Sequence, residues 1–282
     1  MYKMICIDLD GTLLGSDHGI SEENIHAIKK AREKGVLIVL ATGRMHQSAR
    51  LYAEQLDIFD PIISSNGSFV KEREGDRVFY ERNLMKADLK FIIDTLGAFG
   101  VTPNFYNHGT MYVKEVRDFV LRYEELQKSL PKEKSILIRY INDGYSYDDF
   151  MEQDGAGVQK GICFPPVHLV DEIKTRMRLN TDLKVVSSVS SGIKNIEFTS
   201  READKGRAAL VLAKAYGISP EEIICVGDSE NDLTMLEVAG LPVAMGNAID
   251  EVKAAARYIT KDNDSHGVAH LIEKFILRGD LI

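Results

Sequence analysis

Two aspartates near the start of the chain could contribute to a cation site. Asp8 and Asp10 follow the apolar run at residues 4–7, which is typical of a buried strand, and they precede a loop that contains Gly11. Open α/β sheets bind their ligands at the carboxyl ends of the strands, which is where we expect these two carboxylates to lie. Taken alone, the pair could equally be a turn with solvated acids.

A second acidic cluster lies far downstream. Asp228 and Asp232 follow another apolar run, at residues 223–226. Two strand ends that carry carboxylates offer the oxygen ligands that a hard cation such as Mg²⁺ prefers. The alternative is a helix that begins here with favourable acids in its first turn.

Two further segments carry groups that suit an anion. Thr42 and Gly43 follow the apolar run at residues 36–40, and a hydroxyl beside exposed backbone N–H groups can hold a bound anion. Lys205 opens a predicted helix and could add a positive charge. Each residue also has an ordinary interpretation, with Thr42 as a helix cap, Lys205 as a solvated lysine and Asn66 as part of a turn.

These residues are positioned by two blocks of alternating strands and helices at the two ends of the chain. In the first block we predict strands at 3–7, 36–40 and 61–64, helices at 21–35 and 46–56, and a hairpin over 68–71 and 77–81. In the second block we predict helices at 206–216, 231–239 and 268–277, and strands at 223–226, 242–244 and 257–259. Short strands that alternate with helices imply a parallel sheet with right-handed crossovers.

The pattern changes between these blocks. Adjacent strand-like segments at 101–106 and 111–114, and again at 184–189 and 195–199, indicate an α+β insert with an antiparallel sheet. The predicted fold is therefore α/β. A Rossmann-like, doubly wound parallel sheet is expected in residues 1–83 and 201–282, with the insert over residues 84–200.

The composition excludes several classes of partner. Of the 282 residues, 44% are hydrophobic and 28% are charged, which is ordinary for a globular protein. The net charge of −8 argues against a broad surface for nucleic acid or for anionic membranes. Cys6, Cys163 and Cys225 lie in apolar runs and predict buried thiols in a reducing compartment. Without a signal-like start or an apolar run of membrane-spanning length, we expect a cytoplasmic protein.

The chain resembles the haloacid dehalogenase superfamily, in its Cof-like branch of hydrolases, in four ordered motifs. These are Asp-x-Asp-Gly-Thr from Asp8, Thr-Gly-Arg from Thr42, Lys-Gly from Lys205 and Gly-Asp-x-x-Asn-Asp around Asp228. The resemblance covers the whole chain and places the insert where that branch carries a large α/β cap. One departure is the segment at residues 201–204, where the branch usually has a short turn of small residues.

The resemblance implies roles for the acids. Asp8 would be the nucleophile that attacks phosphorus and forms an acyl phosphate. Asp10 would protonate the leaving group and then activate water, and the first of these tasks requires a raised pKa. Mg²⁺ would be held by the carboxylates of Asp8 and Asp228 and by the backbone carbonyl of Asp10.

The resemblance also implies how the phosphate is bound. Its oxygens would be held by Leu9, Thr42, Gly43, Lys205 and Asn231. Asp232 would support Lys205 or the waters of the metal. Weaker candidates for contacts with the rest of the substrate, each with an ordinary structural role as the alternative, are Arg44, Asn66, Tyr106 and His108.

The implied activity is Mg²⁺-dependent hydrolysis of small phosphorylated metabolites, such as sugar phosphates, through an aspartyl-phosphate intermediate. A phosphomutase of the phosphomannomutase type is the nearest alternative, but it needs a cap that grips a second phosphate, and the arginines of the insert are scattered. A non-enzymatic phosphoacceptor that resembles a response-regulator receiver is a third possibility. A receiver would be much shorter and would need neither the insert nor an acid such as Asp10.

Overall fold

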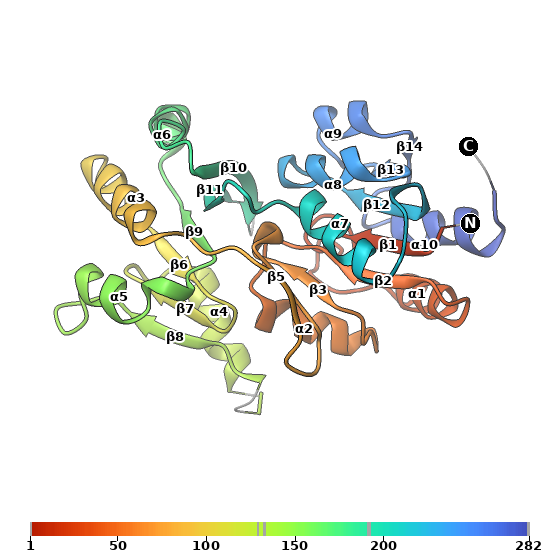
Figure 1. The fold of residues 1–282 in the computed structure, drawn as a ribbon, viewed down its shortest axis with the longest axis horizontal. Helices are drawn as coiled ribbons and strands as arrows, with labels where there is room; N and C mark the ends of the chain where they lie inside the picture. Colours follow the sequence, from red (N-terminus) through yellow and green to blue (C-terminus); the bar gives the residue numbers. More distant parts are fainter. Residues whose placement is uncertain (1, 129, 132–133, 191–192, 281–282) are drawn as a thin grey trace.

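The computed structural model describes residues 2–128, 130–131, 134–190 and 193–280, and it contains a five-stranded parallel sheet (Figure 1). The strands lie in the order β14 (Tyr258–Ile259), β13 (Leu241–Ala244), β12 (Ile223–Gly227), β1 (Met4–Ile7) and β2 (Leu37–Leu40). Every neighbouring pair is parallel, which confirms the prediction. Ile7 lies opposite Val226, so the residues that follow β1 and β12 leave the sheet side by side.

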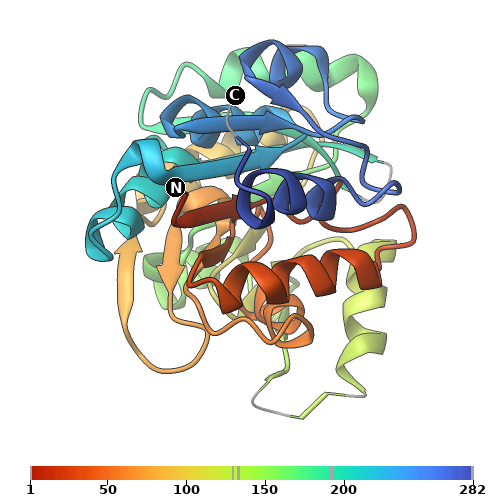
Figure 2. The ribbon, with the colours of Figure 1, turned by 90° about the vertical axis from the view of Figure 1, so that its right-hand side faces the viewer.

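Helices accompany the parallel sheet, namely α1 (Glu22–Glu33), α2 (His46–Gln55), α7 (Lys205–Ala215), α8 (Leu233–Val238), α9 (Asp250–Ala255) and α10 (Gly267–Ile272). Helix α1 packs against α10, as Figure 2 shows, and α7 packs against α8. The side chain of Ser21 caps α1 by accepting a hydrogen bond from the N–H of Asn24. Of the helices in the described part of the chain, none is both long and apolar enough to cross a membrane.

A smaller antiparallel sheet adjoins the parallel one. It contains β3 (Ile62–Ser64), β4 (Phe69–Lys71) and β5 (Val78–Glu81). The predicted hairpin of β4 and β5 is confirmed. Strand β3 departs from the prediction, because it pairs with β4 and is joined to the end of β2 only by a bridge between Ala41 and Ile63. A short turn follows β3 and reverses the chain, which favours antiparallel pairing.

The insert contains a six-stranded sheet and its own helices. The strand order is β10 (Leu183–Ser190), β11 (Ile193–Ser200), β9 (Lys160–Cys163), β6 (Asn104–Tyr106), β7 (Thr110–Val113) and β8 (Leu137–Tyr140). The helices are α3 (Lys86–Ala98), α4 (Asp118–Gln127), α5 (Tyr147–Gln153) and α6 (Val170–Met177). The prediction of an antiparallel sheet is wrong for β7 and β8, which are parallel. Their connection carries α4, and a crossover of that length returns the chain in the same direction.

Other predicted elements differ in detail. Helices α5 and α9 were not predicted, because helices of 7 and 6 residues complete at most two turns and give little hydrophobic periodicity. The helix predicted at 231–239 is divided into a 3₁₀ turn, Glu230–Asp232, and the short helix α8. The final helix, α10, continues as a π-helical segment, Glu273–Leu277.

Buried apolar side chains form one large group in each part of the molecule, and a smaller third group packs Met45, directly before α2, against the insert. One group surrounds the parallel sheet, where all four side chains of β1 are buried. Another lies between the six-stranded sheet and its helices, around Phe105, Phe150 and Phe198. Figure 1 shows the six-stranded sheet to one side of the parallel sheet. The boundaries at residues 83/84 and 200/201 stay predictions.

The two connections between the parallel sheet and the insert lie next to each other. Arg82, on the way into the insert, places Nε 2.5 Å from Oε2 of Glu202, which lies on the way out. The hydroxyl of Tyr80 also donates to the backbone carbonyl of Glu202 at 2.7 Å. The chain therefore enters and leaves the insert at one place.

Candidate active site

A fully buried lysine lies between two aspartates at the carboxyl end of the parallel sheet. Asp8 directly follows β1, and Lys205 is the first residue of α7. Lys205 Nζ lies 2.6 Å from Oδ1 of Asp8 and 2.6 Å from Oδ1 of Asp232. A buried ammonium group is tolerated only when it is paired and hydrogen-bonded, and these carboxylates meet that need. The solvated interpretation of Lys205 is therefore wrong.

Three acids form the carboxylate cluster, which contains Asp8, Asp228 and Asp232. Each offers one oxygen, and these oxygens lie within 4.8 Å of one another. Gly11 adjoins the cluster with φ of +83°, and a Cβ atom there would lie 2.6 Å from Oδ2 of Asp228. The sequence motif therefore needs a glycine at this position both for its backbone conformation and to leave room for the carboxylate.

Hydroxyl and backbone groups fix the two downstream acids. Thr12 Oγ1 donates to Oδ1 of Asp228 at 3.0 Å, and Ser229 Oγ donates to Oδ2 at 2.9 Å. Oδ2 of Asp232 accepts the N–H groups of Asp228 and Ser229 at 2.9 and 3.0 Å. Asp232 thus holds the turn that carries Asp228, and its other oxygen holds Lys205.

The cluster carries more negative than positive charge. Burial raises the pKa of Asp8 well above its ordinary value, against the opposing effect of Lys205. Burial and the neighbouring Asp232 raise the pKa of Asp228 to about 7. Burial alone would lower the pKa of Lys205, but Asp232 and Asp8 outweigh it and raise that pKa. Three carboxylates around one ammonium group fit a divalent cation, since oxygen donors with excess negative charge are what Mg²⁺ prefers.

Asp10 points to a different partner. Its carboxylate accepts two hydrogen bonds from Arg44, with Nε 2.8 Å from Oδ2 and Nη2 2.6 Å from Oδ1. The Asp10 side chain is 43% exposed, yet the surrounding protein still partly desolvates its carboxyl and opposes ionisation; Arg44 outweighs this effect and lowers the pKa of the carboxyl. The expectation that the pKa of Asp10 is raised is therefore wrong for this arrangement. The guanidinium of Arg44 also lies over the ring of Tyr52, 4.9 Å from its centroid.

The loop after β2 is organised by Thr42. The buried hydroxyl of Thr42 accepts the N–H of Arg44 at 3.1 Å. Helix α2 begins later, at His46, and Met45 precedes it without a side-chain cap. Thr42 therefore orders the loop rather than capping the helix. A Cβ atom at Gly43 would lie 2.8 Å from Oδ1 of Asn66, which brings this loop against the next one.

The loop around Asn66 is buried and conformationally unusual. Ser65 and Asn66 have φ of 49° and 56°, in the left-handed region, and Gly67 has φ of 89°. A Cβ atom at Gly67 would lie 2.2 Å from the backbone carbonyl oxygen of Asp204, directly before Lys205. Oδ1 of Asn66 accepts Nδ2 of Asn231 at 3.0 Å. Asn66 is thus more than a solvated turn residue.

Two charged residues of the insert reach this loop. Lys160 in β9 donates Nζ to the backbone carbonyl of Gly43 at 2.6 Å and lies 3.2 Å from Oε1 of Glu197 in β11. Oε2 of Glu197 accepts a hydrogen bond from Nδ2 of Asn66. Neither residue was expected in the site. A weak signal exists for Lys160, which directly precedes the apolar segment at residues 161–164, whereas the strand of Glu197 also carries Lys194 and gives no comparable signal.

The remaining predicted site residues, Tyr106, His108 and Leu9, make no side-chain hydrogen bond or ion pair with the carboxylate cluster in the described part of the chain. Tyr106 is buried beside Lys160, whose Nζ is 5.7 Å from the ring centroid. His108 stacks on Phe69, and its backbone carbonyl accepts the N–H of Gln47 in α2. The side chain of Leu9 is fully buried, so only its backbone could meet a phosphate.

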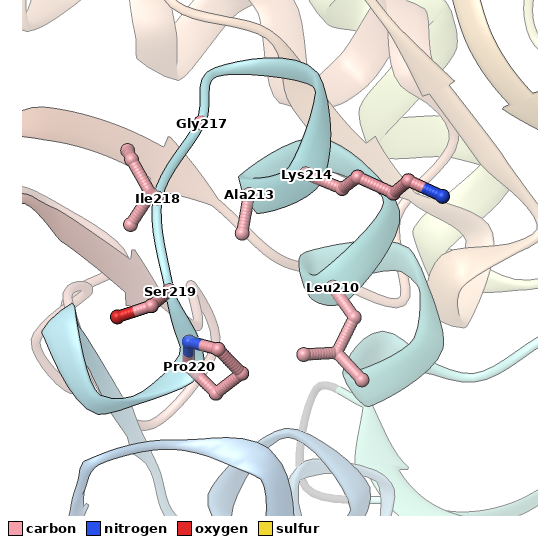
Figure 3. Close-up of a pocket in the computed structure, with 7 residues that line it drawn as sticks. All are labelled: Leu210, Ala213, Lys214, Gly217, Ile218, Ser219 and Pro220. Carbon is pink, nitrogen blue, oxygen red and sulfur yellow. The ribbon is translucent and has the colours of Figure 1, made fainter.

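A shallow groove lies at the other end of α7. Figure 3 shows the residues that line it, namely Leu210, Ala213, Lys214, Gly217, Ile218, Ser219 and Pro220. Lys214 is nine residues after Lys205, which places it about 13 Å farther along the helix at 1.5 Å per residue. The groove is therefore separate from the carboxylate cluster.

Comparisons with known proteins point to one family, and the matches extend over nearly the whole chain. The model of haloacid dehalogenase-like hydrolases matches residues 5–272. The 5-amino-6-(5-phospho-D-ribitylamino)uracil phosphatase YwtE of Bacillus subtilis (strain 168) is 34% identical, with 97% of this chain and 98% of the relative covered. Phosphatase YwpJ of the same strain is 33% identical, with 97% and 100% covered. A solved haloacid dehalogenase-like hydrolase from B. subtilis superposes with a TM-score of 0.83 at 32% identity, covering 97% of this chain and 100% of the other.

Proposed function

The chain belongs to the haloacid dehalogenase-like hydrolase family, and from this premise we propose that it hydrolyses small phosphorylated metabolites through an aspartyl phosphate on Asp8 with the help of Mg²⁺. It is a phosphoric monoester hydrolase, as its similarity to named phosphatases over nearly the whole chain indicates. The observation that carries the proposed mechanism is the buried ion pair of Asp8 and Lys205 inside the carboxylate cluster.

Asp8 performs the first chemical step. Its carboxylate oxygen attacks phosphorus, the bond from phosphorus to the ester oxygen breaks, and Asp10 gives a proton to the departing alkoxide. In the second step Asp10 takes a proton from water, the water oxygen attacks phosphorus, and inorganic phosphate leaves the regenerated Asp8. Lys205 holds Asp8 in place and offsets part of its charge throughout.

The donor set fits a magnesium ion. The carboxylates of Asp8 and Asp228 and the backbone carbonyl of Asp10 would hold it, and Asp232 fixes the turn that presents Asp228. When bound, Mg²⁺ neutralises the charges that would otherwise keep an anionic nucleophile away from an anionic phosphate.

The phosphate oxygens are bound by groups that surround Asp8. We assign this role to the hydroxyl of Thr42, the backbone N–H groups of Leu9 and Gly43, Lys205 and the side-chain amide of Asn231. These donors would stabilise the charge on the transferring phosphoryl group. Asn66 connects these groups, because its N–H donates to the backbone carbonyl of Thr42, its Oδ1 adjoins Gly43 and the same oxygen accepts a hydrogen bond from Asn231, which supports their use as one site.

Residues 84–200 act as the cap that covers this site. Arg44, Asn66, Tyr106 and His108 are the candidates for contacts with the leaving group. YwtE is named for a phosphorylated ribitylamino-uracil, and a sugar or sugar-like phosphate is the corresponding class here. The three buried free cysteines support action in the reducing cytoplasm.

A direct test uses purified protein with p-nitrophenyl phosphate and a panel of sugar phosphates. We expect phosphate release that is lost with EDTA and restored by Mg²⁺, and that is absent in Asp8→Asn. Hydrolysis that is unaffected by chelation would overturn the metal assignment. Interconversion of hexose 1- and 6-phosphates faster than phosphate release would instead favour the mutase.

A further inference from the structure

A chain of polar contacts connects the insert to the proposed phosphate site. We call it the polar relay, and it contains Lys160, Glu197, Asn66 and Asn231. Lys160 Nζ is 3.2 Å from Oε1 of Glu197. Oε2 of Glu197 accepts a hydrogen bond from Nδ2 of Asn66. Oδ1 of Asn66 in turn accepts a hydrogen bond from Nδ2 of Asn231 at 3.0 Å. The first two residues belong to strands of the six-stranded sheet, and the last two belong to short 3₁₀ turns beside the parallel sheet.

The relay has a fixed direction. An ionised carboxylate can only accept hydrogen bonds, so Glu197 obliges Asn66 to turn its NH₂ group towards the insert. The side-chain carbonyl oxygen of Asn66 must then face Asn231. Because this oxygen can only accept a hydrogen bond, Asn231 has to turn its NH₂ group towards it as the donor. One N–H of Asn231 is used in this contact, and the second is left for a phosphate oxygen. The orientation of Asn231 is therefore set from the insert.

The burial of the ion pair argues for a role other than stability. The side chains of Lys160 and Glu197 are only 8% and 6% exposed. A buried ion pair contributes little to stability because the loss of hydration offsets the attraction, and such pairs are best known for fixing one arrangement over another. Lys160 also holds the carbonyl of Gly43 at 2.6 Å, and Oε2 of Glu197 lies 3.5 Å from the position of a Cβ atom at Gly43. The pair thus meets both loops of the phosphate site.

We propose that Glu197 and Lys160 are positioning residues through which docking of the insert completes the phosphate site. With the insert docked, the relay turns the NH₂ of Asn231 towards the phosphate and fixes the Gly43 loop. With the insert undocked, both amides are free to turn over, and Asn231 can present an oxygen that repels phosphate. This inference rests on the proposed phosphatase function.

An exchange of two side chains tests the direction of the relay. Asn66→Asp places two carboxylates face to face, and we expect kcat/KM to fall by roughly 10–100-fold, as for other residues that orient a ligand-binding group. Combining it with Glu197→Gln restores a donor opposite an acceptor, because Gln can donate to Asp while Asp still accepts from Asn231. The double variant should recover to within about fivefold of the unmodified enzyme. A double variant no better than Asn66→Asp would overturn the relay.

Binding of inorganic phosphate provides a readout that does not depend on turnover. Calorimetric titration with phosphate, in the presence of Mg²⁺, should show weaker binding in Asn66→Asp and recovery in the double variant. If Glu197 instead contacts the leaving group, phosphate affinity stays constant and the kcat/KM loss differs between p-nitrophenyl phosphate and a sugar phosphate, which overturns the proposal. If no ester is hydrolysed by the unmodified protein, the proposed function fails while the titration still tests the relay.

Two further variants serve as controls. Ser48→Ala removes a 2.9 Å hydrogen bond to Tyr123, which joins α2 to α4 of the insert outside the relay. We expect its phosphate affinity and kcat/KM to stay within about twofold. If Asn66→Asp does not fold, the single variant Glu197→Gln tests the relay. This substitution keeps the size and shape of the side chain but removes the charge that pairs with Lys160. A phosphate affinity reduced several-fold supports the relay, and an unchanged affinity overturns it.

Discussion

Arg44 holds both carboxylate oxygens of Asp10, at 2.8 and 2.6 Å, although Asp10 is the residue that the proposed mechanism needs as a proton donor. Arg44 lowers the pKa of Asp10 by its hydrogen bonds and its charge, and these outweigh the opposing desolvation of the carboxyl. A carboxyl that must donate a proton is better served by a raised pKa. The pair therefore represents an arrangement that has to change before the first chemical step.

Loss of this pair should be visible in the titration of Asp10. In Arg44→Met we expect the pKa of Asp10 to rise, because the guanidinium that hydrogen-bonds and stabilises the ionised carboxylate is removed. The first step needs protonated Asp10, so the alkaline limb of its pH profile should move to higher pH. NMR titration of the Asp10 carboxyl and rapid-quench rates measure the two effects. A pKa that stays in place would contradict this account of Arg44.

Replacement of Asp8 should separate covalent chemistry from proton transfer. Asp8→Asn keeps an acceptor for Lys205 but removes the nucleophile, so turnover should fall by roughly 10⁴-fold or more without trapped phosphoenzyme. Asp10→Asn should slow turnover by about 10²–10⁴-fold, because it removes only proton transfer. Acid quenching followed by mass spectrometry detects the phosphoenzyme. Its accumulation in Asp8→Asn would assign the nucleophile elsewhere.

Mg²⁺ affinity should depend on pH through Asp228. Burial and Asp232 raise the pKa of Asp228 to about 7 in the metal-free protein, so a proton competes with the cation for this carboxylate below that pH. We expect the affinity to weaken as the pH falls, by about tenfold between pH 8 and pH 6 for one displaced proton. Calorimetric titration of metal-free protein with Mg²⁺ at three pH values measures this. An affinity independent of pH would show that Asp228 does not bind the ion.

Gly67 offers a test of how the loop beside Lys205 is built. In Gly67→Ala the new methyl group would lie 2.2 Å from the carbonyl oxygen of Asp204, and φ of 89° adds strain. We expect the free energy of unfolding to fall by roughly 2–4 kcal/mol. Gly100→Ala is the matched control, since it also has positive φ but no atom within 4 Å of the added methyl group, and it should cost about 1 kcal/mol. Urea unfolding compares them, and equal losses would exclude the steric explanation.

The carboxylate cluster could be predicted from the sequence because sheet geometry alone brings it together. Parallel neighbours end at the same edge, so Asp8 after β1 and Asp228 after β12 had to meet once the two apolar runs were paired. The position of Lys205 at the start of α7 follows the same logic. Such predictions need only local patterns and one topological rule.

The polar relay and the pairing of Arg44 with Asp10 could not be predicted in this way. Lys160 and Glu197 reach the phosphate loops only because the insert packs against the parallel sheet at one particular angle, which no local pattern encodes. The pairing of Asp10 with Arg44 depends on the path of the loop that Thr42 orders. Tertiary packing decides both relationships.

The ion pair between Arg82 and Glu202 has an evolutionary consequence. Because the chain enters and leaves the insert at points that are adjacent in space, a whole insert can be exchanged for another between these two points without rethreading the parallel sheet. The phosphate chemistry would then be inherited intact while recognition of the leaving group diversified. A grafted insert would orient Asn66 and Asn231 in the same way only if it also brought a carboxylate to the place of Glu197.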